Sequence, residues 1–456
     1  MSTPTKPIAA ADSLSASIPS LSSPPALGAR GERALNRAPL LRCSLFECQY
    51  AESNPSGWIN LGVAENSLCV DWLSQYFERN FKLSYSDLST YGTALTGSLR
   101  LFAALRHLFG AYFHARIPVE PAHIITGAGC SAIIDSLVSI LADPGDGILV
   151  AKPHYNGFVS SFGCRNEVEA VGVDLPEGKE ASIEALEAFE RKLVERQAAG
   201  QRVRAIMLCN PHNPLGFCYS RNVLLAYCSF AEKHNLHLIV DEIYALSTFS
   251  TTDTPAPPVP FTSILSLDPL AEAGCNPSRV HMVYSASKDF GANALRLGVL
   301  VSQVNPDVHA AIESSCLLMK ISSAADILWS SLLLDPVALP TYLALNQSLL
   351  STAYARATAF LDLHCIPYRP SSAGHFVWID LRRFLPTVAE GEGDVRASEE
   401  ERETALATRL MQNGVNLARG SAYCGTPGFF RLTFTLRADY FEIGLRRLEQ
   451  ALGLAT

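Results

Sequence analysis

The chain is poor in charged residues, and lysine is especially scarce. Charged residues make up 18% of its 456 residues, and only eight residues are lysines. The net charge is −8 and no run of basic residues occurs, so the sequence gives no support for nucleic-acid binding. No apolar run approaches the roughly 18 residues that a membrane-spanning helix needs. We therefore expect neither nucleic acid nor a membrane among the partners of this protein.

Several motifs of metal proteins and nucleophilic enzymes are also absent. The 12 cysteines stand singly, without C-x-x-C spacing, and the histidines form no H-E-x-x-H motif. No G-x-S-x-G nucleophile motif occurs either. We therefore expect no metal site, no disulfide framework and mostly reduced thiols, as is typical of a cytoplasmic protein.

The N-terminal segment has the composition of a disordered tail. Residues 1–28 are rich in serine, proline and alanine and contain few acids. Such a segment buries too little apolar surface to fold. It lacks the basic start and apolar core of a secretory signal. A transit peptide is the weaker alternative, because the basic residues that follow Lys6 come only at Arg30 and Arg33.

What the chain does contain is a large share of apolar residues in regular patterns. Hydrophobic residues make up 48% of the sequence, which is enough for a sizeable core. Between residues 124 and 301, short apolar runs alternate with stretches of helical spacing. This alternation predicts an α/β fold with a mostly parallel sheet covered by helices on both faces. Residues 375–379 and 430–434 instead alternate as half-buried strands do and flank a helical pattern at 401–412, which predicts a smaller α+β domain.

The individual elements follow from the same patterns. We expect strands at residues 124–126, 147–151, 168–173, 205–208, 238–240, 280–285 and 297–301. We expect helices at residues 70–81, 99–113, 131–141, 183–198, 222–234, 308–334 and 339–363. The run GAGC at residues 127–130 predicts a tight turn, and the acidic run at 390–403 predicts a solvated loop that enters a helix.

In a parallel α/β sheet, functional side chains gather at the carboxyl ends of the strands. One such end carries Lys288, within the run YSASKDFG at residues 284–291. Burial disfavours the charged form of an amine and lowers its pKa, which makes a lysine available to form a Schiff base with a carbonyl. The alternative is a lysine that merely extends from the strand end into solvent.

Other strand ends carry groups that suit a phosphorylated ligand. Asp241 follows an apolar run and could pair with a protonated pyridine nitrogen, or it could be a helix cap or salt-bridge acid. The turn at 127–130 opens a helix whose amides favour a phosphate, and Ala132 excludes the G-x-G-x-x-G dinucleotide motif. Arg296 could bind a phosphate and Arg431 a carboxylate, although a single arginine is more often a surface residue.

Five short motifs occur in one order along the chain. They are GVAEN at residues 62–66, NPHNPLG at 210–216, DEIY at 241–244, SASKDFG at 285–291 with Arg296, and PGFFR at 427–431. This ordered set, which spans about residues 45–450, resembles the fold-type I pyridoxal 5'-phosphate (PLP) enzymes of the class I/II aminotransferase family. The resemblance is closest to 1-aminocyclopropane-1-carboxylate (ACC) synthases and their fungal relatives. It implies a large, mostly parallel-sheet domain with α/β layers and a smaller α+β domain.

The resemblance assigns roles around the cofactor ring. Lys288 would bind PLP as a Schiff base and later move protons. Asp241 would pair with the pyridine nitrogen, and Tyr155 would stack on the ring. Asn213 and Tyr244 would contact its phenolic oxygen.

The resemblance also assigns the residues that bind the phosphate of PLP. The amides of Ala128 and Gly129 would bind it together with Ser285, Ser287 and Arg296.

The remaining roles concern the substrate and the oligomer. By resemblance, Arg431 would bind the α-carboxylate of an amino-acid substrate, and Glu65 would also bind the substrate. Tyr91 would reach the phosphate in a neighbouring subunit, which implies a homodimer with shared active sites. The predicted regions are a disordered tail at 1–40, a segment at 41–85 that contributes to the small domain and to dimer contacts, a large PLP-binding domain at 86–335 and a C-terminal small domain at 336–456.

The resemblance implies an enzyme that acts on an amino acid through an external aldimine. Glu65 in the GVAEN motif favours the ACC-synthase branch, and similar fungal proteins of sulfur-containing secondary metabolism act on cysteine-derived thioethers. We therefore expect cleavage of a C–S bond in a thioether or sulfonium substrate derived from cysteine or methionine. The alternatives are transamination between an amino acid and a 2-oxo acid, and an inactive protein of this fold that serves as a regulator or binding partner. Two segments depart from the ACC-synthase pattern: residues 292–295 read ANAL, and LTG at 95–97 replaces an aromatic-His-Gly sequence.

Overall fold

The computed structural model describes residues 27–33, 35, 48–253, 257–386 and 397–454. Two units are present, Met1–Ser44 and Leu45–Thr456, and all the labelled elements belong to the second. Of the predicted disordered tail at 1–40, residues 27–33 and 35 are described, and residues 29–33 are helical. The rest of the tail lies outside the described residues, as does the first part of the acidic run at 390–403.

The strands and helices have the following bounds. The strands are β1 (Ile59–Asn60), β2 (Ile124–Ala128), β3 (Gly147–Ala151), β4 (Glu169–Val173), β5 (Val203–Cys209), β6 (His237–Asp241), β7 (Val280–Ser285), β8 (Leu297–Val301), β9 (Tyr368–Arg369), β10 (Phe376–Asp380), β11 (Val415–Asn416), β12 (Ala418–Arg419) and β13 (Phe429–Thr433). The helices are α2 (Val70–Asn80), α3 (Tyr85–Ser89), α4 (Leu99–Ala111), α5 (Cys130–Leu141), α6 (Gly157–Asn166), α7 (Ala185–Ala198), α8 (Arg221–Lys233), α9 (Pro269–Ala273), α10 (Pro306–Glu313), α11 (Cys316–Met319), α12 (Ser323–Leu334), α13 (Ala338–Leu363), α14 (Glu399–Gln412) and α15 (Ala438–Leu452).

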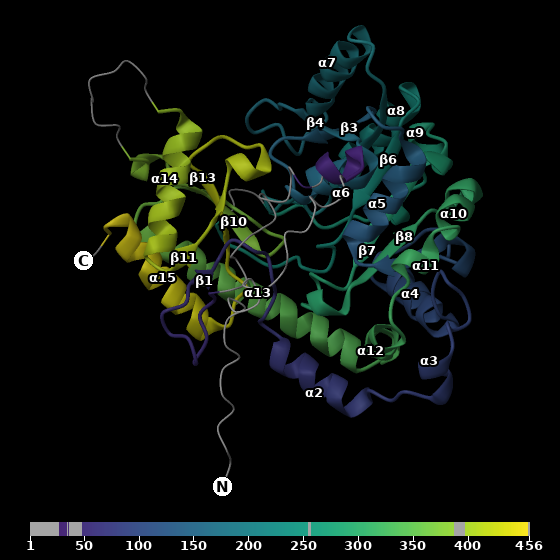
Figure 1. Cartoon of the computed structure of the whole chain (residues 1–456), viewed down its shortest axis with the longest axis horizontal. Coiled ribbons are helices and arrows are strands. Elements are labelled where there is room, and N and C mark those ends of the chain that lie inside the picture. Colours follow the sequence, from purple (N-terminus) through teal and green to yellow (C-terminus); the bar gives the residue numbers. More distant parts are fainter. Residues whose placement is uncertain (1–26, 34, 36–47, 254–256, 387–396, 455–456) are drawn as a thin grey trace, which may run out of the picture. The chain divides into compact units, whose positions relative to one another are not determined.

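The largest sheet has seven strands in the order β2-β8-β7-β6-β5-β3-β4 (Figure 1). Strands β7, β6, β5, β3 and β4 are parallel. Strand β8 instead runs antiparallel to both of its neighbours, β2 and β7. The predicted α/β fold with a mostly parallel sheet is confirmed, with one strand reversed.

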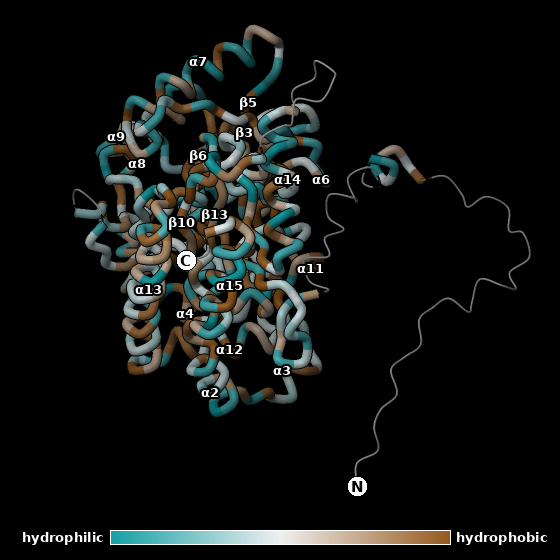
Figure 2. The backbone as a smooth tube through the Cα atoms, turned by 90° about the vertical axis from the view of Figure 1, so that its left-hand side faces the viewer, coloured by the Kyte–Doolittle hydropathy of each residue, from teal (hydrophilic) through white to brown (hydrophobic). Residues whose placement is uncertain are grey.

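Both faces of this sheet are buried, because successive side chains along a strand point to opposite sides. In β3, for example, Leu149 packs into one hydrophobic core and Ile148 into another. Helices α4, α8 and α12 contribute to the first core, and α5, α6 and α10 contribute to the second (Figure 1). In Figure 2 hydrophobic residues, in brown, line the chain around β6, whereas along the outer helix α7 hydrophilic residues, in teal, alternate with hydrophobic ones.

A further core surrounds a four-stranded antiparallel sheet of order β12-β13-β10-β9. Helices α14 and α15 and the short parallel pair β1–β11 pack against it. Helix α13 belongs to two cores, since Leu343 in its first half joins a core of the large sheet and Leu350 in its second half joins the core of the small one. The predicted domain limit at residues 335 and 336 precedes α13, and the domain limits stay a prediction.

The single long helix predicted at residues 308–334 is wrong. The segment forms three helices, α10, α11 and α12. Ser314 ends α10, and the Ser322 side chain caps α12 by accepting a hydrogen bond from the Ala325 amide at 3.2 Å. Serine hydroxyls bind nearby backbone groups and so favour helix ends over helix interiors. Hydrophobic spacing alone does not register such breaks.

The turn predicted at residues 127–130 is shorter than expected. Gly127 and Ala128 still belong to β2, and α5 already begins at Cys130. Gly129 makes the turn with a φ of 89°, a conformation that glycine adopts without steric cost.

The acidic run at 390–403 is not solvated throughout. Its last residue, Glu403, is buried and accepts hydrogen bonds from the Ser421 hydroxyl and from the Gly428 amide. These bonds compensate for the lost hydration of the carboxylate, so Glu403 supports the fold of the small sheet.

In the described part of the chain, no single helix is both long and apolar enough to cross a membrane. One bent pair, α12 with α13, meets the length and composition requirement across a bend of 89°. Both helices supply buried residues to the cores, such as Trp329 and Leu343.

Candidate active site

Lys288 follows β7, and its amine reaches the segment that carries the GVAEN motif. Its Nζ donates a hydrogen bond to the Ala64 carbonyl oxygen at 2.6 Å. Burial and the charge of Arg431 lower the pKa of Lys288 to about 8, against the opposing charges of Glu65 and Asp241. The amine is therefore less basic than an ordinary lysine, which is the property that Schiff-base formation requires.

Asp289 fixes the backbone beside this lysine. Its Oδ2 accepts hydrogen bonds from the Leu246 amide at 3.0 Å and from the Tyr284 hydroxyl at 2.8 Å. Its Oδ1 accepts one from the Ser247 hydroxyl at 2.6 Å. The carboxyl group thus ties the Lys288 segment to the turn that follows β6. Sequence analysis gave Asp289 no role, although its place directly after the lysine was visible.

Asp241 ends β6 between Cys209 of β5 and Val283 of β7. The residue is 3% exposed, and its Oδ1 accepts a hydrogen bond from the Ile243 amide at 3.2 Å and a weak one from the Cys130 thiol at 3.9 Å. Burial raises the pKa of Asp241 to about 7. Within the described ranges Asp241 forms no ion pair, so a bound cation would complete its surroundings.

Gly129, Ser285, Ser287 and Arg296 meet where β2 and β7 end and β8 begins. Arg296 lies so close to Gly129 that a Cβ on Gly129 would collide with the guanidinium group. The Ser285 hydroxyl donates to the Leu297 carbonyl at 2.6 Å and accepts from the Ser287 amide at 3.1 Å. Because α5 also begins here, a guanidinium group and a helix N-terminus share one corner. That combination suits a phosphate.

The backbone amides at this corner differ in whether they already donate a hydrogen bond within the chain. The Gly129 amide donates to the Gly127 carbonyl at 2.7 Å, and Ala128 is the last residue of β2. Cys130, the first residue of α5, therefore stands at the helix N-terminus, where amides lack helical partners. Sequence analysis missed Cys130 because the helical pattern was started one residue later. Phosphate binding by Ala128 and Gly129 stays a prediction.

Arg431 lies in β13 and is 4% exposed. Its Nη1 donates to Asn213 Oδ1 at 2.9 Å, and its Nη2 donates to the Gly62 carbonyl at 2.7 Å. The guanidinium carbon lies 4.7 Å from the centre of the Phe376 ring and 4.9 Å from that of Tyr423. In the described chain Nε has no hydrogen-bond partner, so Arg431 retains a donor for a further acceptor.

Tyr155 belongs to the same group. Burial raises its pKa to about 12, and the charges of Tyr423, Arg431 and Asp241 all act on it. Its ring meets Phe158 edge to face, with 5.3 Å between the ring centres. Tyr155 therefore stays neutral at ordinary pH and offers an aromatic ring near both Asp241 and Arg431.

Tyr244 lies in the turn after β6 and is 2% exposed. Its ring meets His375 and Phe376 edge to face, with 5.1 and 5.4 Å between ring centres. Burial raises the pKa of Tyr244 well above its usual range, so the hydroxyl keeps its proton and can donate a hydrogen bond. Sequence analysis missed His375, because a histidine at the start of a buried strand looks like any other core residue.

Glu65 is exposed, unlike the residues on either side of it. Its charge acts on Lys288, and its backbone carbonyl accepts a hydrogen bond from the Thr435 hydroxyl. Within the described residues the Glu65 carboxylate has no hydrogen bond or ion pair, and its charge acts on the lysine amine.

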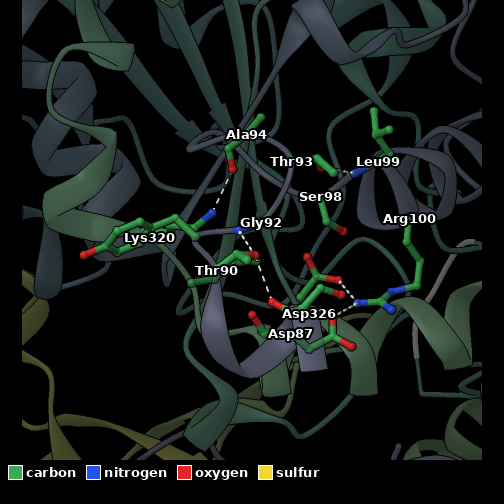
Figure 3. A pocket seen from close by; sticks show the side chains of 14 residues that line it. Asp87, Thr90, Gly92, Thr93, Ala94, Ser98, Leu99, Arg100, Lys320 and Asp326 are labelled. Carbon is green, nitrogen blue, oxygen red and sulfur yellow. Dashed lines mark hydrogen bonds and ion pairs between the residues drawn. The ribbon is translucent and has the colours of Figure 1, made fainter. Parts of the chain in front are cut away.

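Tyr91 lies apart from the group around Lys288. It is 73% exposed and lines a surface pocket together with Lys320 and Asp326 (Figure 3). Among the residues that the structure describes, the lining of this pocket includes neither Lys288 nor Arg431. The placement of Tyr91 within one chain therefore does not bring it to the other predicted site residues.

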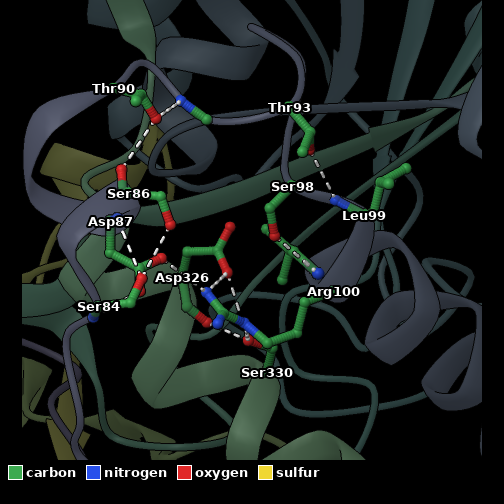
Figure 4. A network of polar contacts seen from close by, with 12 residues as sticks. Ser84, Ser86, Asp87, Thr90, Thr93, Ser98, Leu99, Arg100, Asp326 and Ser330 are labelled. Carbon is green, nitrogen blue, oxygen red and sulfur yellow. Dashed lines mark hydrogen bonds and ion pairs between the residues drawn. The ribbon is translucent and has the colours of Figure 1, made fainter.

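A polar network supports the pocket beside Tyr91. The Arg100 guanidinium donates to Asp326 at 3.0 Å and to the Ser330 hydroxyl at 3.0 Å (Figure 4). The Lys320 amine donates to the Ala94 carbonyl at 2.8 Å (Figure 3). The two Arg100 bonds link α4 and α12, and the Lys320 bond joins the segments that precede these two helices.

Comparison with known proteins shows one family. The family model for aminotransferase class I and II matches residues 57–448. The chain is 36% identical, over 87% of its length and 89% of the relative's, to the probable aminotransferase gliI of Aspergillus fumigatus. It is 32% identical to the bovine (Bos taurus) 1-aminocyclopropane-1-carboxylate synthase-like protein 1, over 88% of this chain and 77% of that protein. A solved aspartate aminotransferase from Thermus thermophilus, with maleate, superposes with a TM-score of 0.67 at 18% identity, over 93% of this chain and 95% of that one. The chain therefore belongs to the class I and II aminotransferase family and is an ACC-synthase-like, PLP-dependent enzyme of fold type I.

Proposed function

We propose that this enzyme binds PLP through Lys288 and cleaves the C–S bond of a thioether or sulfonium amino acid derived from cysteine or methionine. The observation that carries the proposal is the pairing of a buried guanidinium, Arg431, with aromatic rings and the free carboxylate of Glu65 around one lysine amine. The guanidinium group suits the α-carboxylate of an amino acid. The aromatic rings and the Glu65 carboxylate suit a substrate side chain that carries no negative charge.

The residues present fit PLP. Asp241, a buried carboxylate that forms no ion pair with the described residues, suits a protonated ring nitrogen. The corner where Arg296 lies over Gly129 suits the phosphate. When bound, PLP supplies an electron sink that stabilises negative charge at the substrate Cα. Tyr155 would then stack on the ring, and Asn213 and Tyr244 would bind its phenolic oxygen.

Arg431 orients the substrate. A guanidinium group binds a carboxylate through two parallel N–H donors. The substrate α-carboxylate would take the donors now used by Asn213 and the Gly62 carbonyl, together with the free Nε–H. The rings of Phe376 and Tyr423 exclude water from this pair and strengthen it.

Lys288 moves the proton. With a pKa of about 8, its amine is neutral in a larger fraction of molecules near neutral pH than that of an ordinary lysine. The neutral Nζ takes the proton from the substrate Cα, and the C–S electron pair leaves with sulfur. For a cysteine conjugate, the products after water has been added are a thiol, pyruvate and ammonia.

The surroundings of Lys288 favour sulfur over a second carboxylate. Glu65 would repel an anionic side chain and attract a sulfonium cation. The rings of Tyr155 and Tyr423 suit a thioether sulfur, which packs favourably against aromatic edges, or a sulfonium cation above a ring face. The second candidate is transamination, which the name of the Aspergillus fumigatus relative favours.

A screen of substrates separates the two candidates. We expect a cysteine S-conjugate to release pyruvate, ammonia and thiol in equal amounts, at least about ten-fold faster than any amino acid is converted to its 2-oxo acid. Pyruvate is followed with lactate dehydrogenase, ammonia with glutamate dehydrogenase and thiol with a disulfide reagent. Release of a 2-oxo acid that keeps its sulfur, with accumulation of the pyridoxamine form, would instead identify an aminotransferase.

We also propose a homodimer in which Tyr91 completes the site of the neighbouring subunit. Tyr91 is exposed, and large apolar side chains near it in sequence, Tyr85 and Leu88, are 84% and 72% exposed. An exposed cluster of this kind is typical of a protein–protein contact. Such an arrangement would bring the Tyr91 hydroxyl to the phosphate that Arg296 holds in the other chain.

Mixed dimers test the shared site. Tyr91→Ala and Lys288→Ala proteins are each expected to have little activity. After their subunits are mixed in equal amounts and allowed to exchange, we expect about a quarter of wild-type activity, because half of the dimers then contain one intact site. Lys288→Ala protein treated in the same way with itself is the control. No recovery, when labelled subunits are shown to exchange, would mean that Tyr91 acts within its own chain or not at all.

A further inference from the structure

His375 stands directly before β10 and is fully buried. Its Nε2 lies 3.0 Å from the Ser247 hydroxyl, which itself donates to Asp289 at 2.6 Å. Because the serine proton is used in that bond, Nε2 must carry the proton that it shares with the serine oxygen. Nδ1 is then an unprotonated acceptor, and in the described structure it has no hydrogen-bond partner.

The charges around His375 keep it neutral. Burial first, and then the nearby cations Lys288 and Arg431, hold the pKa of His375 well below its usual range. The imidazole meets the Tyr244 ring edge to face, at 89° between the ring planes. This geometry directs the polar edge of one ring to the face of the other.

A second buried histidine shows how a purely structural imidazole is satisfied in this chain. His281, at the start of β7, has a partner on both ring nitrogens: His237 Nδ1 at 3.0 Å and the Ser302 hydroxyl at 3.0 Å. A buried acceptor without a partner destabilises a protein, and an apolar side chain would avoid that cost. The bare nitrogen of His375 is therefore not explained by packing.

We propose that His375 is a positioning residue that holds Tyr244 in place relative to Lys288, by linking the Tyr244 ring through Ser247 to the Asp289 carboxylate beside the lysine. The link joins three elements that are distant in the sequence: the strand β10, the turn after β6 and the segment after β7. The inference rests on the proposed function, which assigns Lys288 and Tyr244 to PLP. It adds the residue that holds these two side chains in a fixed position relative to each other.

The link between His375 and Tyr244 should shift, in a direction that can be derived, the pH at which the visible absorbance of the bound cofactor changes. A Tyr244 hydroxyl that donates to the phenolic oxygen of PLP stabilises the negative charge there, and so favours loss of the proton shared with the lysine nitrogen. When Tyr244 is displaced, this stabilisation weakens, and the pH at which the visible absorbance changes must rise.

The experiment titrates the visible absorbance of the holoenzyme. We expect His375→Leu, which keeps bulk but removes both nitrogens, to raise the midpoint by about half a pH unit or more. The dissociation constant of PLP for the apoprotein should rise about five-fold. Ser247→Ala, which leaves the imidazole but breaks the link, should shift both quantities in the same direction.

His281→Leu is the matched control, because it removes an equally buried imidazole that also bonds to a serine hydroxyl. It should lower the melting temperature and leave the absorbance midpoint unchanged. If His375→Leu loses stability but keeps the wild-type midpoint and PLP affinity, His375 is a core residue and the proposal is overturned. If His375→Leu does not fold, an unchanged midpoint in Ser247→Ala overturns it equally. A wild-type protein whose visible absorbance does not depend on Lys288 would instead refute the proposed function itself.

Discussion

Replacing Lys288 by alanine should lower kcat by at least about 1,000-fold and abolish the visible absorbance of covalently bound PLP. The physical reason is that one amine would both hold the cofactor and move the Cα proton, and a positioned general base alone contributes about 100- to 10,000-fold. Steady-state kinetics and the absorbance spectrum of the purified protein measure the two effects. Added methylamine should restore part of the rate, since a free amine can accept the proton that Lys288 no longer takes.

The matched control is Lys233→Ala. Lys233 lies at the end of α8 and pairs with Glu190 at 3.0 Å on an exposed face, where an ion pair contributes little to stability. This variant should keep wild-type kcat and spectrum. Lys288→Ala protein with wild-type activity would refute the assignment of Lys288 and, with it, the whole of the proposed mechanism.

Replacing Arg431 by glutamine should reduce kcat/KM for amino acids by at least about 100-fold, equivalent to roughly 3 kcal/mol. The variant loses the guanidinium that binds the α-carboxylate, and a neutral amide does not replace a charged two-pronged donor. Most of the effect should lie in KM, because the carboxylate is bound throughout the reaction. Arg431→Lys keeps the charge but not the planar guanidinium group. Its kcat/KM should lie between those of the wild-type and Arg431→Gln proteins.

A substrate without a carboxylate is the control for this prediction. Wild-type and Arg431→Gln proteins should react at similar, low rates with the corresponding amine, since that molecule has no group for Arg431 to bind. The variant should also keep the visible absorbance of bound PLP. An equal loss of activity toward the amine and the amino acid would show that the substitution damages the fold, for example by leaving Asn213 and the Gly62 carbonyl without their donor.

The strands of the large sheet could be predicted because each is a short, continuous apolar run, and the physical reason for such a run, burial on both faces, leaves few alternatives. Asp241 and Lys288 could be singled out for the same reason: Asp241 directly follows such a run and Lys288 comes four residues after one, which places both at strand ends. The direction of β8 could not be predicted, because apolar composition does not distinguish a parallel from an antiparallel neighbour. That reversal is what brings Arg296 next to Gly129.

Contacts between distant segments account for the rest of what was missed. The Arg431–Asn213 bond joins residues 218 positions apart, and the Ser247–His375 contact joins residues 128 positions apart. No local pattern encodes either pair. Glu403 was misjudged for a related reason: an acidic run at a helix start is normally solvated, and only the fold of the small sheet supplies the donors that allow this one to be buried.

The two anchors of the Lys288–Arg296 segment bear on how easily this enzyme can acquire new substrates. Asp289 holds the lysine end through its three hydrogen bonds, while Arg296 is held independently because it directly precedes β8, whose register with β2 is continuous. Residues 292–295 lie between these anchors, and the Asn293 carbonyl accepts a hydrogen bond from Arg296 Nη1 at 2.9 Å. That bond uses the backbone of Asn293 rather than its side chain, so a side-chain substitution at an exposed position of this stretch leaves it in place. Within the ANAL run, where ACC synthases differ, Ala292 is buried and Ala294 is exposed, so Ala294 is the position at which substitutions are best tolerated.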